Sequence, residues 1–345
     1  MAMRDPSLKL LDQTKRQYLR LAMGLGGLVI AFPSNKKPSK PKALQWRERA
    51  MVGLGTTLSL RAGHASVERA DAGLDAAVQA IRHVERHMSL FNPESSLCRL
   101  NREGVLNQPN HDLVKILTLS RHVSERSQGI FDVTVQSLWD VWQNAKQLNR
   151  LPTASELKLA RSKTGWQHLE ITTERVRLLR PEMALTLNGI AQGYASDLAR
   201  VALRLQGVEH ALIDTGEWST LGQSTDSRPW SLGIENPRRI DAIIASIVSD
   251  GRAIATSSDA HCSFSADMRH HHIFDPRTGY SPPELASVTV LAPTCALADA
   301  LTKVMFMESP EGAIAAAKQW QVDVLVVDKA GRLHASPGLK FGLNT

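Results

Sequence analysis

Residues 185–197 read LTLNGIAQGYASD, and this stretch says more about how the chain folds than any other. An apolar segment at residues 184–187 precedes a turn that contains Gly189, and apolar residues at helical spacing follow over residues 190–205. This order predicts a strand, a turn and a helix. A glycine in such a turn lets a ligand approach the backbone closely, and the start of a helix favours an anion. The stretch has neither a GxGxxG motif nor a Walker loop, so an ordinary strand–helix connection is the competing interpretation.

The rest of the chain alternates between helical and extended patterns. Helices are predicted at residues 66–87, 112–128, 295–307 and 312–320, and strands at residues 54–60, 175–179, 211–214, 243–248, 288–291 and 322–327. Hydrophobic residues make up 43% of the chain and charged residues 22%, which is typical of globular proteins. We therefore expect a mixed α/β protein of the α+β class, with mixed sheets flanked by helices.

The chain is basic, but its excess positive charge lies near the N-terminus. The 345 residues carry a net charge of +7. Residues 1–49 contain eleven Lys and Arg and three acids, so this segment is +8 and the remainder is −1. Binding to a nucleic-acid backbone needs Lys and Arg clustered on the folded body. The composition therefore argues against a nucleic-acid partner.

The N-terminal segment resembles an export signal. Residues 21–32 form an uncharged run of twelve after the basic residues 15–20, whereas a membrane-spanning helix takes about 20 apolar residues. We expect residues 1–49 to be a basic leader that contains an apolar segment or anchor at residues 18–33 and a Lys/Pro linker, and residues 50–345 to form the functional domain. A buried core helix is the alternative, although the glycines in the run disfavour it. Export fits both a cleaved leader and one retained as a membrane anchor.

Three cysteines, Cys98, Cys262 and Cys295, are too few and too scattered for a disulfide scaffold or a zinc site. Either one disulfide or three separate thiols fit this spacing.

Residues 269–282, RHHHIFDPRTGYSP, predict a tight exposed loop because Asp-Pro and Thr-Gly favour turns. If the three histidines are extended, only one or two of them can face the same site. Asp275, Arg277 and Thr278 place an acid, a guanidinium that can bind phosphate, and a hydroxyl within four residues. A polar turn that satisfies its own backbone is the alternative.

Two aspartates lie in apolar surroundings. Asp299 lies in the middle of the predicted helix at residues 295–307, with Thr302 and Lys303 on the same helical face. A carboxylate on an apolar face needs a partner, so this group is either a metal or phosphate site or an ordinary Asp–Lys pair. Asp132, next to Phe131, could bind a ligand or cap a helix.

Taken together, these segments resemble the FAD:protein FMN transferase family, known as the ApbE family, over about residues 51–340. The resemblance is carried by Gly55-Thr56-Thr57; by His87-Met88-Ser89 with Pro93, Ser96 and Asn101; and by residues 129–134, 188–197, 211–222, 230–237, 255–257, 272–279 and 287–302. It implies a bacterial periplasmic enzyme, exported or anchored to the inner membrane. It also implies that FAD is the donor, that Mg²⁺ is required, and that FMN is transferred to a Ser or Thr hydroxyl of an exported acceptor protein while AMP leaves.

The resemblance also implies roles for individual residues. A metal ion would be held by the Gly189 carbonyl and the Asp299 carboxylate, with Thr302 as a substitute hydroxyl ligand. The flavin nucleotide would be bound by Leu54, Gly55, Thr56, Ile130, Phe131, Asp132, Thr186, Gln192 and Ile273. His272, Asp275 and Lys303 would lie at the reacting end, where a neutral His272 imidazole is the candidate for proton transfer.

Several positions depart from the family pattern. Thr186 stands where Asp is usual, Gln192 where Lys or Glu is usual, Glu217 where a second glycine is usual, and Ser258 where glycine is usual. Lys303 stands where the family has a hydroxyl ligand four residues after the metal-binding Asp. An ammonium could take part of the cation's place as a point charge, so we expect weak or no Mg²⁺ binding. The alternatives to flavin transfer are a non-catalytic or weakened FAD-binding protein, and a Mg²⁺-dependent FAD pyrophosphatase that yields FMN and AMP.

Overall fold

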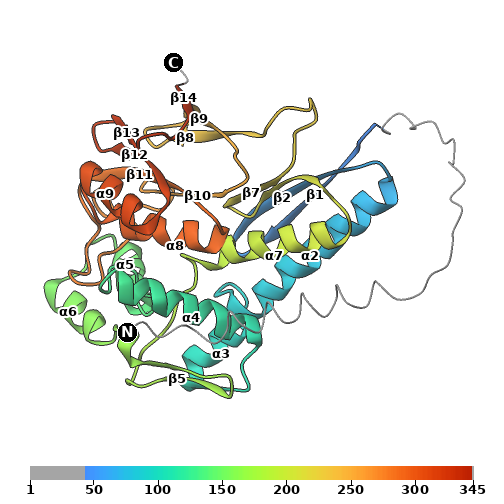
Figure 1. The fold of residues 1–345 in the computed structure, drawn as a ribbon. Helices are drawn as coiled ribbons and strands as arrows, with labels where there is room; N and C mark the ends of the chain where they lie inside the picture. Colours follow the sequence, from blue (N-terminus) through green and yellow to red (C-terminus); the bar gives the residue numbers. More distant parts are fainter. Residues whose placement is uncertain (1–42, 344–345) are drawn as a thin grey trace, which may run out of the picture. The chain divides into compact units, whose positions relative to one another are not determined.

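A computed structural model describes residues 43–343, which form one compact unit (Figure 1). The predicted apolar segment at residues 18–33 lies outside this range. The first strand, β1 (Gln45–Gly53), begins before residue 50, so the folded domain already includes the last residues that we assigned to the leader. Between residues 43 and 343, no helix is both long and apolar enough to cross a bilayer.

The largest sheet has eight strands. Their order is β1, β2 (Thr56–His64), β6 (His210–Asp214), β7 (Trp218–Leu221), β10 (Ala253–Ser258), β11 (Leu285–Ala292), β12 (Asp323–Asp328) and β13 (Leu333–Ala335). Two three-stranded sheets have the orders β14 (Phe341–Leu343), β9 (Arg239–Val248), β8 (Ser231–Asn236) and β3 (Val105–Asn107), β5 (Arg175–Leu178), β4 (Leu169–Ile171). Every pairing between these named strands is antiparallel, which agrees with the expected α+β class.

Three helices, α2 (Val67–Met88), α7 (Ala191–Leu205) and α8 (Cys295–Phe306), lie along one face of the main sheet (Figure 1). The β14-β9-β8 sheet packs on the other face through Ile234, Ile254 and Leu291, among other apolar residues. The remaining helices are α3 (Ser96–Glu103), α4 (His111–Arg126), α5 (Gln136–Gln147), α6 (Ala154–Ser162) and α9 (Pro310–Trp320), with a short 3-10 turn at Trp166–His168.

Local signals explain where the helices begin. The Ser66 hydroxyl caps α2 by accepting the Arg69 N–H at 3.2 Å. Thr153 and Glu156 form a reciprocal capping box at the start of α6. Pro310 is the first residue of α9. A backbone N–H at this position would have no partner within the helix, so its absence in proline removes no hydrogen bond. The predictions for α2, α4, α7, α8 and α9 are confirmed to within about two residues at each end.

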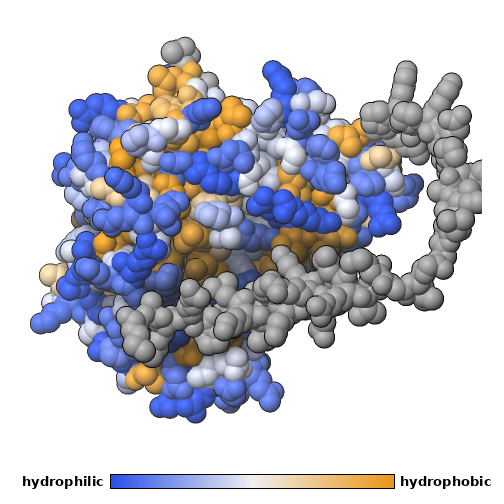
Figure 2. Space-filling view, in the orientation of Figure 1, coloured by the Kyte–Doolittle hydropathy of each residue, from blue (hydrophilic) through white to orange (hydrophobic). Residues whose placement is uncertain are grey.

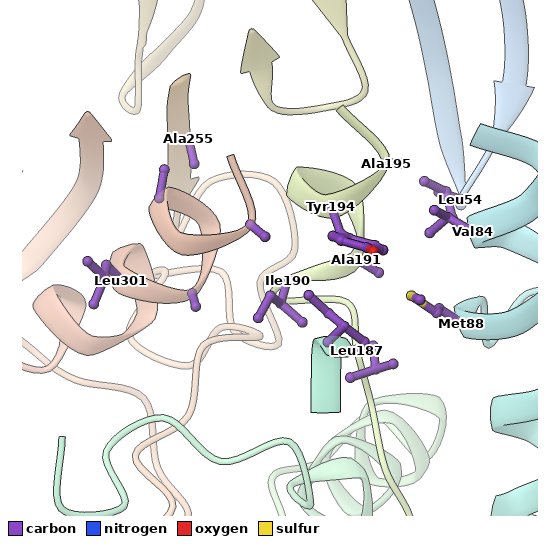
Figure 3. Close-up of a cluster of buried hydrophobic side chains, with 14 of the residues drawn as sticks. Leu54, Val84, Met88, Leu187, Ile190, Ala191, Tyr194, Ala195, Ala255 and Leu301 are labelled. Carbon is purple, nitrogen blue, oxygen red and sulfur yellow. The ribbon is translucent and has the colours of Figure 1, made fainter. Parts of the chain in front are cut away.

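The main core lies between the sheet and the helical layer. Figure 3 shows part of it, with Leu54 and Val84 close together and Leu187 and Ile190 at the entry to α7. Full burial of one such leucine or isoleucine contributes about 2 kcal/mol, so this cluster dominates the stability of the domain. On the face drawn in Figure 2, hydrophilic side chains alternate with small apolar areas.

Two strand predictions are wrong in part. Residues 184–187 form no strand, and the Asn101 side chain rather than a neighbouring strand pairs with the Leu185 backbone. Its amide donates to the Leu185 carbonyl at 2.9 Å and accepts the Leu185 N–H at 2.8 Å. The strand predicted at residues 54–60 begins only at Thr56, because Leu54 and Gly55 have φ values of 51° and 83° and form the β1–β2 hairpin turn.

Helices α7 and α8 touch at Gly193. A Cβ at this position would lie 2.3 Å from the Cys295 carbonyl oxygen, so no larger residue fits without moving the helices apart. The Asp197 carboxylate accepts the N–H groups of Cys295 and Ala296 at 2.8 and 3.0 Å, which ties α7 to the first turn of α8. These contacts fix α8, and with it Asp299 and Lys303, against the segment around Gly189.

Candidate active site

A cavity of about 480 Å³ opens where the segments singled out in the sequence converge. Its apolar and aromatic lining is Ile130, Phe131, Val133, Val135, Trp139, Ile273, Phe274 and Pro276. Its remaining lining is Thr56, Asp132, Thr186, Asn188, Gly189, Gln192, Gly216, Glu217, Thr256, Ser257, Ser258, His261, His272 and Lys303. An apolar wall with a few convergent polar groups is the usual form of a ligand site, and this volume lies within the usual range.

Asp299 does not line the cavity, but its partner Lys303 does. The Asp299 side chain is 0% exposed, whereas that of Lys303 is 21% exposed. One carboxylate oxygen of Asp299 is bound to the Lys303 ammonium, and the other accepts the Gly193 N–H at 3.2 Å. Both carboxylate oxygens are therefore engaged within the protein.

The predicted hydroxyl ligand, Thr302, is also engaged. It donates to the Asp299 backbone carbonyl at 2.6 Å and lies 2.7 Å from the Ser257 hydroxyl. Its side chain is fully buried and does not line the cavity. Within the described chain, no group of three or more His, Cys, Asp or Glu side chains is arranged to hold a metal ion. These residues, as arranged, do not fit a divalent cation.

Glu217 is a cavity residue to which the sequence analysis gave no role. Its Oε2 accepts the Thr256 N–H at 2.9 Å. Burial, reinforced by the nearby Asp299 carboxylate, raises the pKa of Glu217 well above its ordinary value. A carboxylic acid kept neutral in this way can donate a hydrogen bond to an anionic ligand. The available signal in the sequence was Glu217 itself, an acid that follows Gly216 where the family usually has a second glycine.

The three histidines face different surroundings, and only His272 lines the cavity. His270 stacks on Trp142, His271 is fully buried against Phe306, and His272 lines the cavity. Nδ1 of His272 lies 3.3 Å from the Cys262 carbonyl oxygen, which favours a proton on Nδ1 and leaves Nε2 as a hydrogen-bond acceptor. Burial and the Lys303 charge lower the pKa of His272 to about 4, so the ring is neutral near pH 7.

Asp275 does not line the cavity. Its carboxylate pairs with the Arg277 guanidinium at 2.8 Å, and its backbone carbonyl accepts the Gly279 N–H at 2.7 Å. The indole N–H of Trp142 donates to the Gly279 carbonyl at 2.9 Å, so the loop is also held from α5. The structure thus places Asp275 in the turn that presents His272 and Ile273, not at the cavity surface.

Asp132 both lines the cavity and organises its own turn. Its Oδ1 accepts the backbone N–H and the hydroxyl of Thr134 at 2.8 and 2.7 Å, and its Oδ2 accepts the Trp166 N–H at 3.1 Å. Burial raises the pKa of this carboxyl above its ordinary value. The carboxylate holds the 130–135 segment in shape but does not cap α5, which begins after Val135 without a side-chain cap. Its position on the cavity wall is compatible with the ligand-binding interpretation.

Leu54 and Gly55 lie at the hairpin turn and do not line the cavity, although the next residue, Thr56, does. The Leu54 N–H donates to Glu85 at 3.1 Å, which anchors the turn to α2. Trp139 lines the cavity and also packs against the buried cluster around Trp142. The cysteines Cys98, Cys262 and Cys295 are free thiols.

Comparison with solved structures defines the fold class. The ApbE protein of Thermotoga maritima matches with a TM-score of 0.77 at 25% identity, over 85% of this chain and 97% of that one. The apo form of the flavinyl transferase ApbE of Pseudomonas stutzeri matches with a TM-score of 0.73 at 26% identity, over 85% and 94%. The chain therefore has the fold of the flavin transferases of this type.

Comparison of sequences gives the family. A profile of the ApbE family matches residues 54–326, which contain every residue that lines the cavity. The FAD:protein FMN transferase of Vibrio cholerae is 31% identical over 258 residues, 72% of this chain and 77% of that protein. One of Klebsiella pneumoniae is 28% identical over 72% and 74%. The chain belongs to the ApbE family.

Proposed function

We propose that this protein transfers FMN from FAD to a Ser or Thr hydroxyl of an acceptor protein and releases AMP. The observation that carries the proposal is the cavity itself. It gathers Phe131, Gly189 and His272, which come from separate segments that each carry the family resemblance. Family membership supports the same activity, because the curated relatives are FAD:protein FMN transferases.

The reaction is a phosphoryl transfer. The acceptor oxygen forms a bond to the phosphorus of the FMN half of FAD, and the bond from that phosphorus to the bridging oxygen of the pyrophosphate breaks. The bridging oxygen leaves with AMP, and the acceptor hydroxyl loses its proton. In such reactions, positioning and neutralisation of charge do most of the catalysis.

The cavity residues suit these tasks. We assign the uptake of the acceptor proton to Nε2 of His272; the support is that Nδ1 faces the Cys262 carbonyl, which leaves Nε2 as the accepting nitrogen. The Lys303 ammonium provides positive charge, and Gly189 and Gln192 bring the start of α7 to the cavity, where a helix N-terminus favours an anion. The apolar and aromatic lining around Phe131 and Trp139 suits the planar rings of FAD.

The activity is tested by incubating the purified protein with FAD and a small exported redox protein as the acceptor. Mass spectrometry of the acceptor and chromatography of the nucleotides give separate readouts. A mass increase on the acceptor together with AMP supports the proposal. AMP and FMN without a modified acceptor indicate a pyrophosphatase, and bound intact FAD alone indicates a binding protein.

We also propose that the protein works in the periplasm, exported or anchored by its N-terminal segment. The support is the basic run at residues 15–20 followed by the apolar run at residues 21–32. Fractionation of cells that express the full chain tests this. Recovery of the protein in the cytoplasmic fraction alone would contradict it.

A further inference from the structure

The cavity holds a single strong cation. Among the residues of the described chain that line it, Lys303 is the only Lys or Arg. A pyrophosphate ester carries negative charge on both phosphates, and burying that charge is costly without a positive partner. Lys303 is therefore the lysine or arginine side chain of this lining that can pair with the phosphates of a bound dinucleotide.

Lys303 also fills the space between two residues that would ligate a metal. Its ammonium binds the Asp299 carboxylate, one turn earlier on α8. On the other side, its Cε would lie 3.2 Å from a Cβ built on Gly189. The side chain thus runs past Gly189 and ends on Asp299, so the position between these two residues already holds a positive charge.

We propose that the Lys303 ammonium replaces the divalent cation at Asp299, so that this protein binds FAD without Mg²⁺. The inference rests on the proposed function, because FAD is taken as the ligand. The ammonium has three N–H donors, and the contacts within residues 43–343 assign one of them, to Asp299. The other two are available to phosphate oxygens.

The substitution has a definite electrostatic consequence. A divalent cation on one carboxylate leaves a net charge of +1 for the phosphates, whereas an ammonium on the same carboxylate leaves none. Lys303 therefore holds the ligand through hydrogen bonds and position more than through net charge. Replacing Lys303 with threonine should reopen the space beside Asp299 to a metal ion. The threonine also restores the hydroxyl ligand expected in the family.

The test compares FAD binding in EDTA and in millimolar MgCl₂, measured by quenching of flavin fluorescence. For the wild-type protein we expect dissociation constants that agree within twofold in the two buffers. For Lys303→Thr we expect binding at least tenfold weaker in EDTA and recovery of most of that loss in MgCl₂. Lys303→Arg keeps the charge and should stay independent of Mg²⁺.

The matched control is Lys329→Thr. Like Lys303, Lys329 binds a fully buried aspartate, with its ammonium 2.6 Å from Asp259, but it does not line the cavity. In this variant Asp259 keeps its pair with Arg238, at 2.7 Å, so the control reports the loss of a lysine from a buried aspartate without touching the ligand. This variant should bind FAD as the wild type does in both buffers, and thermal unfolding of each variant checks that it is folded.

A second measurement does not depend on FAD. Isothermal titration with MgCl₂ alone should show no binding at micromolar concentrations to the wild type, and one site in Lys303→Thr. Wild-type binding of Mg²⁺ that is unchanged in Lys303→Thr, or FAD binding by the wild type that is lost in EDTA, overturns the inference. If FAD binds neither protein, the proposed function fails, and the Mg²⁺ titration still decides whether Lys303 occupies the cation position.

Discussion

At the scale of single residues, the side chain that carries the chemistry is His272. Its Nδ1 faces the Cys262 carbonyl, and its low pKa keeps the ring neutral, so Nε2 is unprotonated over the whole physiological range. The neighbouring His270, stacked on Trp142, does not line the cavity. The two histidines have different roles because they lie in different surroundings, His270 against Trp142 and His272 at the cavity.

His272→Gln should lower the rate of flavin transfer by about 10²- to 10⁴-fold, the usual contribution of a general base. FAD affinity should change much less, because the phosphate contacts come from other residues. Single-turnover transfer and FAD titration separate the two effects. His270→Gln is the control and should keep near wild-type rates.

Because the pKa of His272 is about 4, wild-type transfer should not fall between pH 8 and 6 through this group. A decline centred near pH 6.5 that disappears in His272→Gln would contradict this assignment.

His271 makes stability depend on pH. It is 0% exposed, and its Nε2 has no hydrogen-bond partner among residues 43–343. Burial, together with the charge of Lys329, lowers its pKa to about 3. The unfolded chain binds a proton near the ordinary pKa and the folded chain does not, so the free energy of unfolding falls as pH falls below about 6.5 toward 3.

His271→Phe should remove this dependence while keeping an aromatic ring against Phe306. If His271 is the only group responsible, the free energy of unfolding of the wild type should fall by about 2 kcal/mol between pH 7 and pH 5. The free energy of unfolding of the variant should not show this loss. At pH 7 the variant should be at least as stable as the wild type, because it no longer buries an unpaired N–H. Urea denaturation at the two pH values measures both effects. Equal losses in the two proteins would show that His271 is not the source.

At the scale of elements, the site depends on how closely α7 approaches α8. Gly193 permits the approach, the Asp197 carboxylate binds the first turn of α8, and the Gly193 N–H reaches Asp299. The positions of Asp299 and Lys303 relative to Gly189 therefore follow from a contact between two helices. The loop of residues 269–282 adds the other wall, held by the Asp275–Arg277 pair and by Trp142.

Gly193→Ala should destabilise the protein by roughly 2 kcal/mol or more, because its Cβ would collide with backbone that cannot rotate away. It should also weaken FAD binding, since α8 carries Lys303. Gly312→Ala in α9 is the control: there the nearest atom is the Glu308 carboxylate at 2.9 Å, the end of a flexible side chain. That variant should be close to neutral or slightly stabilised by helix propensity. Similar denaturation midpoints for the two variants would mean that the helix contact is not tight.

At the scale of the whole molecule, residues 43–343 contain a continuous core, and residues 45–49 belong to its first strand. A protein that starts at residue 43 should therefore unfold at the same temperature as the full chain, within about 2 °C, and should bind FAD equally well. When expressed in the original host, it should stay in the cytoplasm. Differential scanning calorimetry and cell fractionation test the two parts. A markedly lower melting temperature would show that the first 42 residues contribute to folding.

The positions of most helices and strands could be predicted because they depend on local patterns. The periodicity of α2, the capping residues and the turn chemistry of the 269–282 loop all act within a few residues. The segment at 184–187 could not be predicted correctly, because its backbone partner is the side chain of Asn101, 84 residues away along the chain. Thr56, Phe131 and His272 were identified through the family resemblance, which brings in information about long-range contacts.

The sequence by itself determined the α+β class, the location of the excess charge near the N-terminus, and the family. These depend on composition, local periodicity and the order of motifs along the chain. Only the tertiary structure decided that Asp275 lies in a turn, that Glu217 and Trp139 face the cavity, and that Lys303 rather than Thr302 reaches toward Gly189 from α8. The physical reason is that burial and pairing depend on neighbours brought from distant parts of the chain. Lys303 lies four residues after Asp299 on α8. The two become a pair at the cavity only because another helix packs against them and excludes water.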